Sequence, residues 1–148
     1  MRDEIPNGNF ELILNAFTSF GYFSNPADDV KTLTHVKNAL SEDGYFVFDF
    51  LNAHQVIKNL VKKETKIVDN VTFNLKRFVE NKSICKTISF VAEGKELSFT
   101  ERVDALYLED FQEYFKTVGL KIKHVFGDYY LNPFEKETSK RLIIIAQK

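Results

Sequence analysis

Two loops that are rich in polar and aromatic side chains each follow a short apolar run of the sequence. Their candidate ligand-binding side chains are Asn15, Ser19 and Tyr22 in the first loop, and Asn52 and His54 in the second. In open α/β sheets, ligands bind outside the carboxyl ends of the strands. The two loops therefore predict the rim of a small-molecule pocket. For the second loop an alternative stays open, in which Asn52 only caps the following helix.

Other common chemistries have no support in the residue types and spacings. The sequence has no glycine-rich phosphate loop, no zinc-ligand spacing and no serine-centred nucleophile elbow. His35, His54 and His124 fall in different predicted elements, so we expect no metal site. Cys85 is the one cysteine, which excludes an intrachain disulfide and favours a packed thiol. The net charge of −1 gives no field that would recruit nucleic acid or an anionic membrane.

The first third of the chain predicts a strand, a helix and a second strand. Residues 10–17 contain three consecutive apolar residues, typical of a strand that is buried on both faces of a parallel sheet. Residues 28–40 have the apolar spacing of an amphipathic helix, and Gly44 is free to adopt a positive φ at its exit. Residues 45–50 predict the second strand and residues 53–63 a second helix. A strand, a helix and a strand within about 40 residues indicate a right-handed βαβ unit.

The middle of the chain changes to a period of two. Apolar and polar residues alternate, with short polar turns between them, in segments 66–69, 71–80, 84–92 and 97–106. This pattern predicts antiparallel hairpins that form a meander with one covered face and one face in water.

The last third predicts one helix and two strands. Residues 108–120 suit a helix that Gly119 ends, and residues 121–129 and 141–147 suit strands. At 148 residues, without an obvious linker, the chain fits a single domain. Its 15 Phe and 6 Tyr are expected to supply core, and those near turns could also line a pocket.

Targeting signals are not evident in the sequence. Residues 1–6 contain no apolar segment of a secretory signal, and the longest purely apolar run, residues 142–146, is far shorter than a membrane span. We therefore expect a cytoplasmic protein that binds neither nucleic acid nor membrane.

Several segments, in this order, resemble the C-terminal half of class I S-adenosylmethionine-dependent methyltransferases that act on small molecules. Residues 10–23 are similar to the fourth strand and its loop, and residues 40–49 to the start of the fifth strand, where Gly44 follows a leucine and polar residues. Residues 139–148 resemble the closing antiparallel strand. The resemblance implies an α/β fold, the C-terminal portion of a Rossmann-like methyltransferase sheet. The antiparallel meander at residues 64–106 would be an insert that covers the substrate.

The resemblance also implies a cofactor, S-adenosylmethionine, and roles for individual residues. The cofactor-binding positions are Asn15, Ala16 and Phe17. The substrate-side positions are Ser19 and Tyr22, with Asn52, His54 and Tyr130 as weaker candidates. The implied reaction is in-line displacement at the sulfonium methyl by a nucleophilic atom of a small-molecule acceptor. Positioning supplies much of the catalysis of such a step, and Tyr22 or His54 could orient or deprotonate the acceptor.

One departure from the family concerns the elements that come before this point in its members. The glycine-rich loop and the acidic strand end that grip the cofactor are missing from the sequence. We therefore expect a truncated methyltransferase that alone binds the cofactor weakly or not at all. Its first strand would form an open sheet edge that favours a homodimer. Two alternatives remain: a non-enzymatic remnant or binding module on the same scaffold, and a different Rossmann-like enzyme such as a nucleotide-dependent oxidoreductase.

Overall fold

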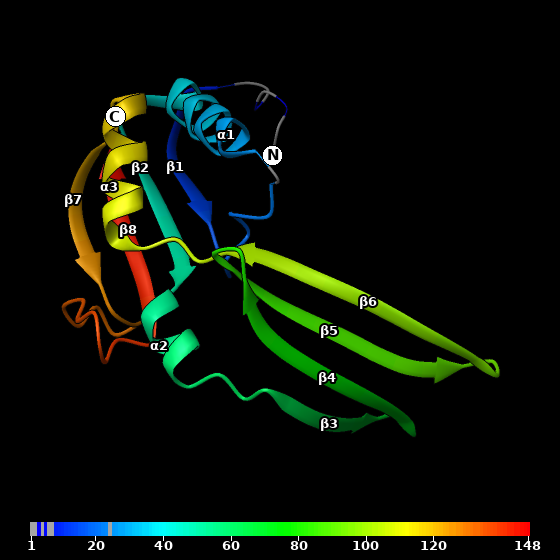
Figure 1. Cartoon of the computed structure of the whole chain (residues 1–148). Coiled ribbons are helices and arrows are strands. Elements are labelled where there is room, and N and C mark those ends of the chain that lie inside the picture. The colour runs from blue at the N-terminus through cyan, green and yellow to red at the C-terminus, as the bar shows by residue number, and fades with distance from the viewer. Residues whose placement is uncertain (1–2, 4, 6–7, 24) are drawn as a thin grey trace. The chain divides into compact units, whose positions relative to one another are not determined.

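A computed structural model describes residues 3, 5, 8–23 and 25–148 of the chain (Figure 1). The prediction for residues 1–6 falls partly outside the described residues. The chain divides into two compact units, Met1–Gln55 with Leu106–Lys148, and Val56–Ala105. Among the described residues, no helix combines the length and the apolar character that a membrane crossing needs.

The first unit is built on a mixed four-stranded sheet with the strand order β1-β2-β8-β7. Its strands are β1 (Phe10–Asn15), β2 (Leu40–Leu51), β7 (Lys121–Phe126) and β8 (Arg141–Gln147). The helix α1 (Pro26–Ala39) connects β1 to β2, and these two strands are parallel, as the sequence predicted. Strand β8 is antiparallel to both β2 and β7, which confirms the predicted closing strand.

Phenylalanine side chains form the core of this unit between β2 and the helix α3 (Leu108–Val118). Phe46, Phe48 and Phe50 lie on one face of β2 because strand side chains alternate. Phe111 and Phe115 are one turn apart on α3, and all five rings are fully buried. The ring centroids of Phe48 and Phe111 are 4.8 Å apart. The aromatic residues of the sequence therefore supply much of the core. Because side chains alternate along β2, Asp49 lies on the opposite face of the strand from these phenylalanines.

The ends of two helices differ in how well the sequence predicted them. Gly119 ends α3 in the left-handed conformation, with φ of 79°, as expected. The helix α2 (Ala53–Lys58) is shorter than the predicted segment 53–63. The carbonyl groups of Val61 and Lys62 instead accept hydrogen bonds from the side chain and the backbone of Arg77. Pairing with a neighbouring strand thus replaces the last predicted helical turn.

Gly44 does not have the role that the sequence predicted for it. Strand β2 begins at Leu40, directly after α1, and Gly44 lies within the strand without a positive φ. A Cβ atom at this position would lie 2.7 Å from the carbonyl oxygen of Phe10. A glycine is needed here because β1 approaches β2 closely, not because a helix ends.

The prediction that β1 is buried on both faces is wrong. Leu12 and Leu14 are 59% and 61% exposed. Their partners in the register are Tyr45 and Val47, so the four side chains share one face of the sheet. In the described part of the chain β1 pairs with β2 on one side and carries no strand on the other. The strand is therefore an edge with an apolar face.

The second unit contains an antiparallel sheet with the strand order β3-β4-β5-β6. The strands are β3 (Lys63–Val68), β4 (Val71–Glu80), β5 (Ser83–Ala92) and β6 (Lys95–Asp104). Each connecting turn has two residues with positive φ: Asp69 and Asn70, Asn81 and Lys82, and Glu93 and Gly94. This is the backbone of the two-residue hairpin turn that matches the twist of the strands. The hairpins that the alternation predicted are thus present.

Candidate functional site

The carboxyl end of β1 leads into a tight turn with an unusual backbone. Phe17 and Thr18 both adopt the left-handed conformation, with φ of 58° and 62°, which is uncommon for residues with a side chain. The backbone N–H and the hydroxyl group of Ser19 donate to the carbonyl oxygen of Ala16 over 3.3 and 2.9 Å. The turn buries Thr18 and leaves Phe17 81% exposed.

The side chain and backbone of Asp49, near the carboxyl end of β2, hold this turn. Asp49 is buried, and its Oδ2 atom accepts hydrogen bonds from the backbone N–H of Phe17, over 2.8 Å, and from the hydroxyl of Tyr129, over 3.0 Å. Its backbone oxygen accepts from the N–H of Thr18 over 3.1 Å. The left-handed turn is therefore fixed from the neighbouring strand.

Arg141, the first residue of β8, compensates the buried charge of Asp49. Its Nε and Nη2 atoms both lie 2.7 Å from Asp49 Oδ1, and Nη2 also donates to Thr18 Oγ1 over 3.1 Å. Hydrogen bonds between ionised partners are roughly twice as strong as neutral ones. We name the set Phe17, Thr18, Asp49, Tyr129 and Arg141 the Asp49 network.

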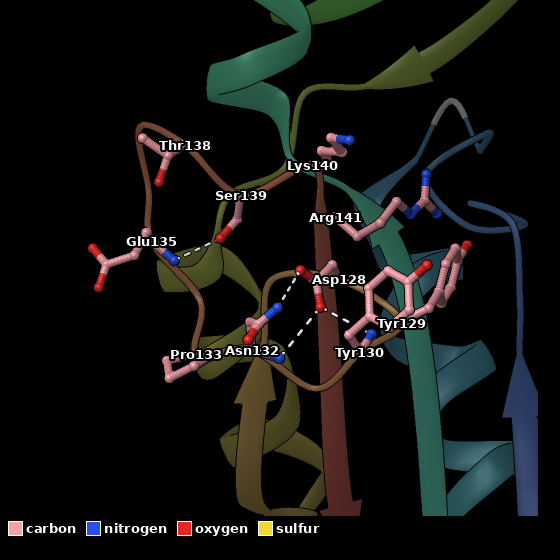
Figure 2. A pocket seen from close by; sticks show the side chains of 10 residues that line it. All are labelled: Asp128, Tyr129, Tyr130, Asn132, Pro133, Glu135, Thr138, Ser139, Lys140 and Arg141. Atoms are coloured by element: carbon pink, nitrogen blue, oxygen red, sulfur yellow. Dashed lines mark hydrogen bonds between the residues drawn. The ribbon is translucent and has the colours of Figure 1, made fainter.

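A cleft of about 650 Å³ adjoins this network in the loop between β7 and β8 (Figure 2). In Figure 2, Tyr129, Tyr130 and Arg141 lie at one end of the cleft, and Glu135, Thr138 and Ser139 lie at the other. The remaining lining residues are Asp128, Asn132, Pro133 and Lys140. Tyr130 is 89% exposed, so its ring is available to a ligand.

The carboxylate of Asp128 fixes the start of the cleft loop. It accepts hydrogen bonds from the backbone N–H groups of Tyr130 and Asn132 and from the Asn132 side chain. The hydrogen bond that the Asn132 side chain donates is the main reason why the pKa of Asp128 is lowered. Strand β7 ends at Phe126, before the end at residue 129 that the sequence predicted. Partial burial, followed by the hydrogen bond to Asp49, raises the pKa of Tyr129.

A second, smaller cavity of about 210 Å³ lies beside Asn52 and His54. Asn52 is buried, its Oδ1 accepts from the N–H of His54, and its Nδ2 donates to the carbonyl oxygens of Lys136 and Ser139. The ring centroids of His54 and Tyr107 are 4.3 Å apart. Asn52 thus makes the capping contact and also holds the cleft loop, while a role for either residue in substrate binding stays a prediction.

Comparison with known proteins identifies the fold. No protein-family model matches the sequence, and no curated protein matches it. Among solved structures, an S-adenosylmethionine-dependent methyltransferase from Clostridium acetobutylicum is similar, with a TM-score of 0.83 and 24% identity over 99% of this chain and 61% of that one. An S-adenosylmethionine-bound amino pentose methyltransferase from Micromonospora echinaspora has a TM-score of 0.71 and 13% identity over 99% of this chain and 62% of that one. A sugar N-methyltransferase from a Streptoalloteichus species has a TM-score of 0.76 and 11% identity over 99% of this chain and 59% of that one.

The chain has a class I methyltransferase fold. It spans about three-fifths of the length of these methyltransferases. The resemblance that the sequence showed is confirmed at the level of the fold.

The predicted site residues lie at three places in the first unit. Asn15, Ala16 and Phe17 form the end of β1 and the start of its turn, and Ser19 and Tyr22 follow them with exposed side chains. Tyr130 lines the larger cleft, while Asn52 and His54 line the smaller cavity.

Sequence reasoning missed the residues that fix the turn. Asp49 is a charged residue inside an apolar strand, and a buried charge requires a partner. That signal was available, but Arg141 lies 92 residues away in the chain. Only the pairing of β2 with β8 identifies it as the partner.

Proposed function

We propose that this chain is part of a methyltransferase that transfers the methyl group of S-adenosylmethionine to a small molecule, on a Rossmann-like sheet. The observation that carries the proposal is the left-handed turn at the carboxyl end of β1, which the buried Asp49 and the half-buried Arg141 fix. Strained backbone of this kind clusters at functional sites. The methyltransferase fold and its small-molecule and sugar methyltransferase neighbours support the same proposal.

The end of β1 fits one side of a cofactor site. Phe17 presents an exposed aromatic ring, and Leu12 and Leu14 give the adjacent strand an open apolar face. A ring face attracts a cationic group, so Phe17 suits the positive sulfonium of S-adenosylmethionine. When bound, this cofactor supplies a methyl group that is already a strong electrophile. We assign cofactor binding to Asn15, Ala16 and Phe17.

The remaining parts of the cofactor site are proposed to come from residues outside this sequence. The chain lacks the glycine-rich loop that grips the cofactor in the family it resembles, and it spans about three-fifths of its neighbours. Contacts to the ribose and the adenine would therefore be incomplete in the chain alone.

The acceptor side is proposed to include Ser19 and Tyr22, with contributions from Tyr130 in the larger cleft and from Asn52 and His54 in the smaller cavity. Because the sulfonium is reactive, these residues mainly have to position the acceptor. The phenol of Tyr22 or the imidazole of His54 can also take a proton from it. The antiparallel sheet of β3 to β6 is proposed to cover the acceptor.

A cofactor panel tests the proposal. Calorimetric titrations with S-adenosylmethionine, S-adenosylhomocysteine and NADH should show binding of the first two, with dissociation constants weaker than micromolar, and none of NADH. Phe17→Ala should weaken that binding, while the matched control Val91→Ala, which replaces a 62% exposed residue of β5, should not. Preferential binding of NADH would support the oxidoreductase alternative. Binding of S-adenosylmethionine at micromolar or tighter affinity would overturn the proposal that the cofactor site is incomplete in this chain.

A further inference from the structure

We propose that Asp49 is a positioning residue that couples the cleft between β7 and β8 to the turn after β1, so that the two rearrange together. Asp49 would act through Phe17 and Tyr129 and would not touch a ligand itself. The proposal concerns the free protein and does not depend on which cofactor or acceptor the site takes.

The coupling follows from one shared acceptor atom. Asp49 Oδ2 receives both the N–H of Phe17 and the hydroxyl of Tyr129, while Oδ1 is engaged by Arg141. A displacement of either donor changes the position or the strength of the other bond. Because the carboxylate is buried, water does not readily replace a lost partner.

The turn at Phe17 and Thr18 is the part of the Asp49 network that can change its conformation when a hydrogen bond to Asp49 is displaced. Two consecutive residues with side chains in the left-handed region persist only where their surroundings impose that conformation. The imposed contacts here are the two hydrogen bonds from Phe17 and Thr18 to Asp49 and the bond from Arg141 to Thr18. If these contacts loosen, Phe17 and Thr18 are expected to relax toward an ordinary backbone conformation.

The cleft loop is the part that can transmit a displacement. The Asp128 carboxylate holds the backbone of Tyr130 and Asn132, which follow Tyr129 in the loop. The N–H of Arg141 donates to the carbonyl oxygen of Gly127. Tyr129 is therefore held between a braced loop and Asp49. Arg141 both lines the cleft and pairs with Asp49, which provides a second connection.

Amide hydrogen exchange at Phe17 tests the first half of the proposal. Asp49→Asn keeps the size of the side chain but removes its charge, so the Phe17 amide should exchange about tenfold faster, as expected for a lost charge-assisted bond. The pKa of Tyr129, followed by ultraviolet titration, should fall toward its ordinary value in the same variant. The control Tyr45→Phe, which also removes one tyrosine hydroxyl from the first unit, should change neither measurement.

A double-mutant cycle tests the coupling itself and uses variants that leave the ion pair of Asp49 and Arg141 in place. Asn132→Ala loosens the cleft loop and should change the exchange rate of the Phe17 amide about threefold, a typical size for coupled sites. In a Tyr129→Phe background the same substitution should have a clearly smaller effect on Phe17, because only the connection through Arg141 remains. An equal effect in both backgrounds, or none in either, would overturn the proposal. These measurements need no ligand, so a failed cofactor panel would leave them interpretable.

Discussion

Association between copies of this chain should depend on the exposed face of β1. Leu12 and Leu14 lie on a strand that has β2 as its partner on one side and an open edge on the other, within the described residues. Such an edge invites pairing with another chain, and the neighbouring leucines would be covered when it pairs. Replacing both leucines with lysine should therefore weaken a homodimer without disturbing the core.

The size of the effect follows from the exposure of the two side chains. Full burial of a leucine contributes about 1.5–3 kcal/mol. Leu12 and Leu14 are 59% and 61% exposed, so covering both on one chain would contribute about 2–3.5 kcal/mol. The dissociation constant of the dimer should therefore rise at least about 30-fold in the double variant.

Light scattering across a concentration series is the appropriate assay. The control is Val91→Lys on β5, because Val91 is 62% exposed and lies in the other unit. The reasoning would be refuted if the double variant and the control associated like the original chain. A stable monomer at high concentration, with residues 12–16 protected from hydrogen exchange, would go further. It would show that the chain covers its own edge and is a self-contained fold.

Three further predictions concern the acceptor side, the core and the cleft loop. In a complete enzyme, Tyr22→Phe should reduce methyl transfer with nearly unchanged cofactor affinity, and a loss of cofactor binding at constant turnover per bound cofactor would contradict this role. Phe111→Ala should lower the free energy of unfolding by about 3–5 kcal/mol in urea titrations, whereas the 57% exposed Phe99 should tolerate alanine. Because the pKa of Asp128 is lowered in the folded chain, its contribution to stability is present at neutral pH and is lost as the pH falls below about 4. The amide resonance of Tyr130 should follow that titration, and Asn132→Ala should raise its midpoint; an unmoved midpoint would count against the hydrogen bond as the cause.

Local patterns predicted much of the fold because they depend on neighbours in the sequence. The bounds of β8 and the end of α3 at Gly119 were predicted from apolar periodicity and glycine conformation. Gly44 was misread because its constraint is the carbonyl oxygen of Phe10, on another strand. The exposure of Leu12 was misread for a similar reason, since a run of apolar residues does not reveal whether other elements cover it.

The candidate site was predictable only in part. The rule that ligands bind at the carboxyl ends of strands, together with the family resemblance, singled out the segment from Asn15 to Phe17. The contacts that shape this segment come from Asp49 and Arg141, which are distant in sequence and become neighbours through the pairing of β2 with β8. No local spacing encodes such a pair.

A residue-resolved titration tests the central claim, that the end of β1 forms part of a site for S-adenosylmethionine. Isotope-labelled chain would be titrated with S-adenosylhomocysteine while the backbone amide resonances are followed by NMR. The account predicts that the amides of Asn15, Ala16 and Phe17 shift most and saturate together, while those of β5 and β6 stay unchanged. Shifts confined to other parts of the chain, or none at millimolar ligand, would contradict it.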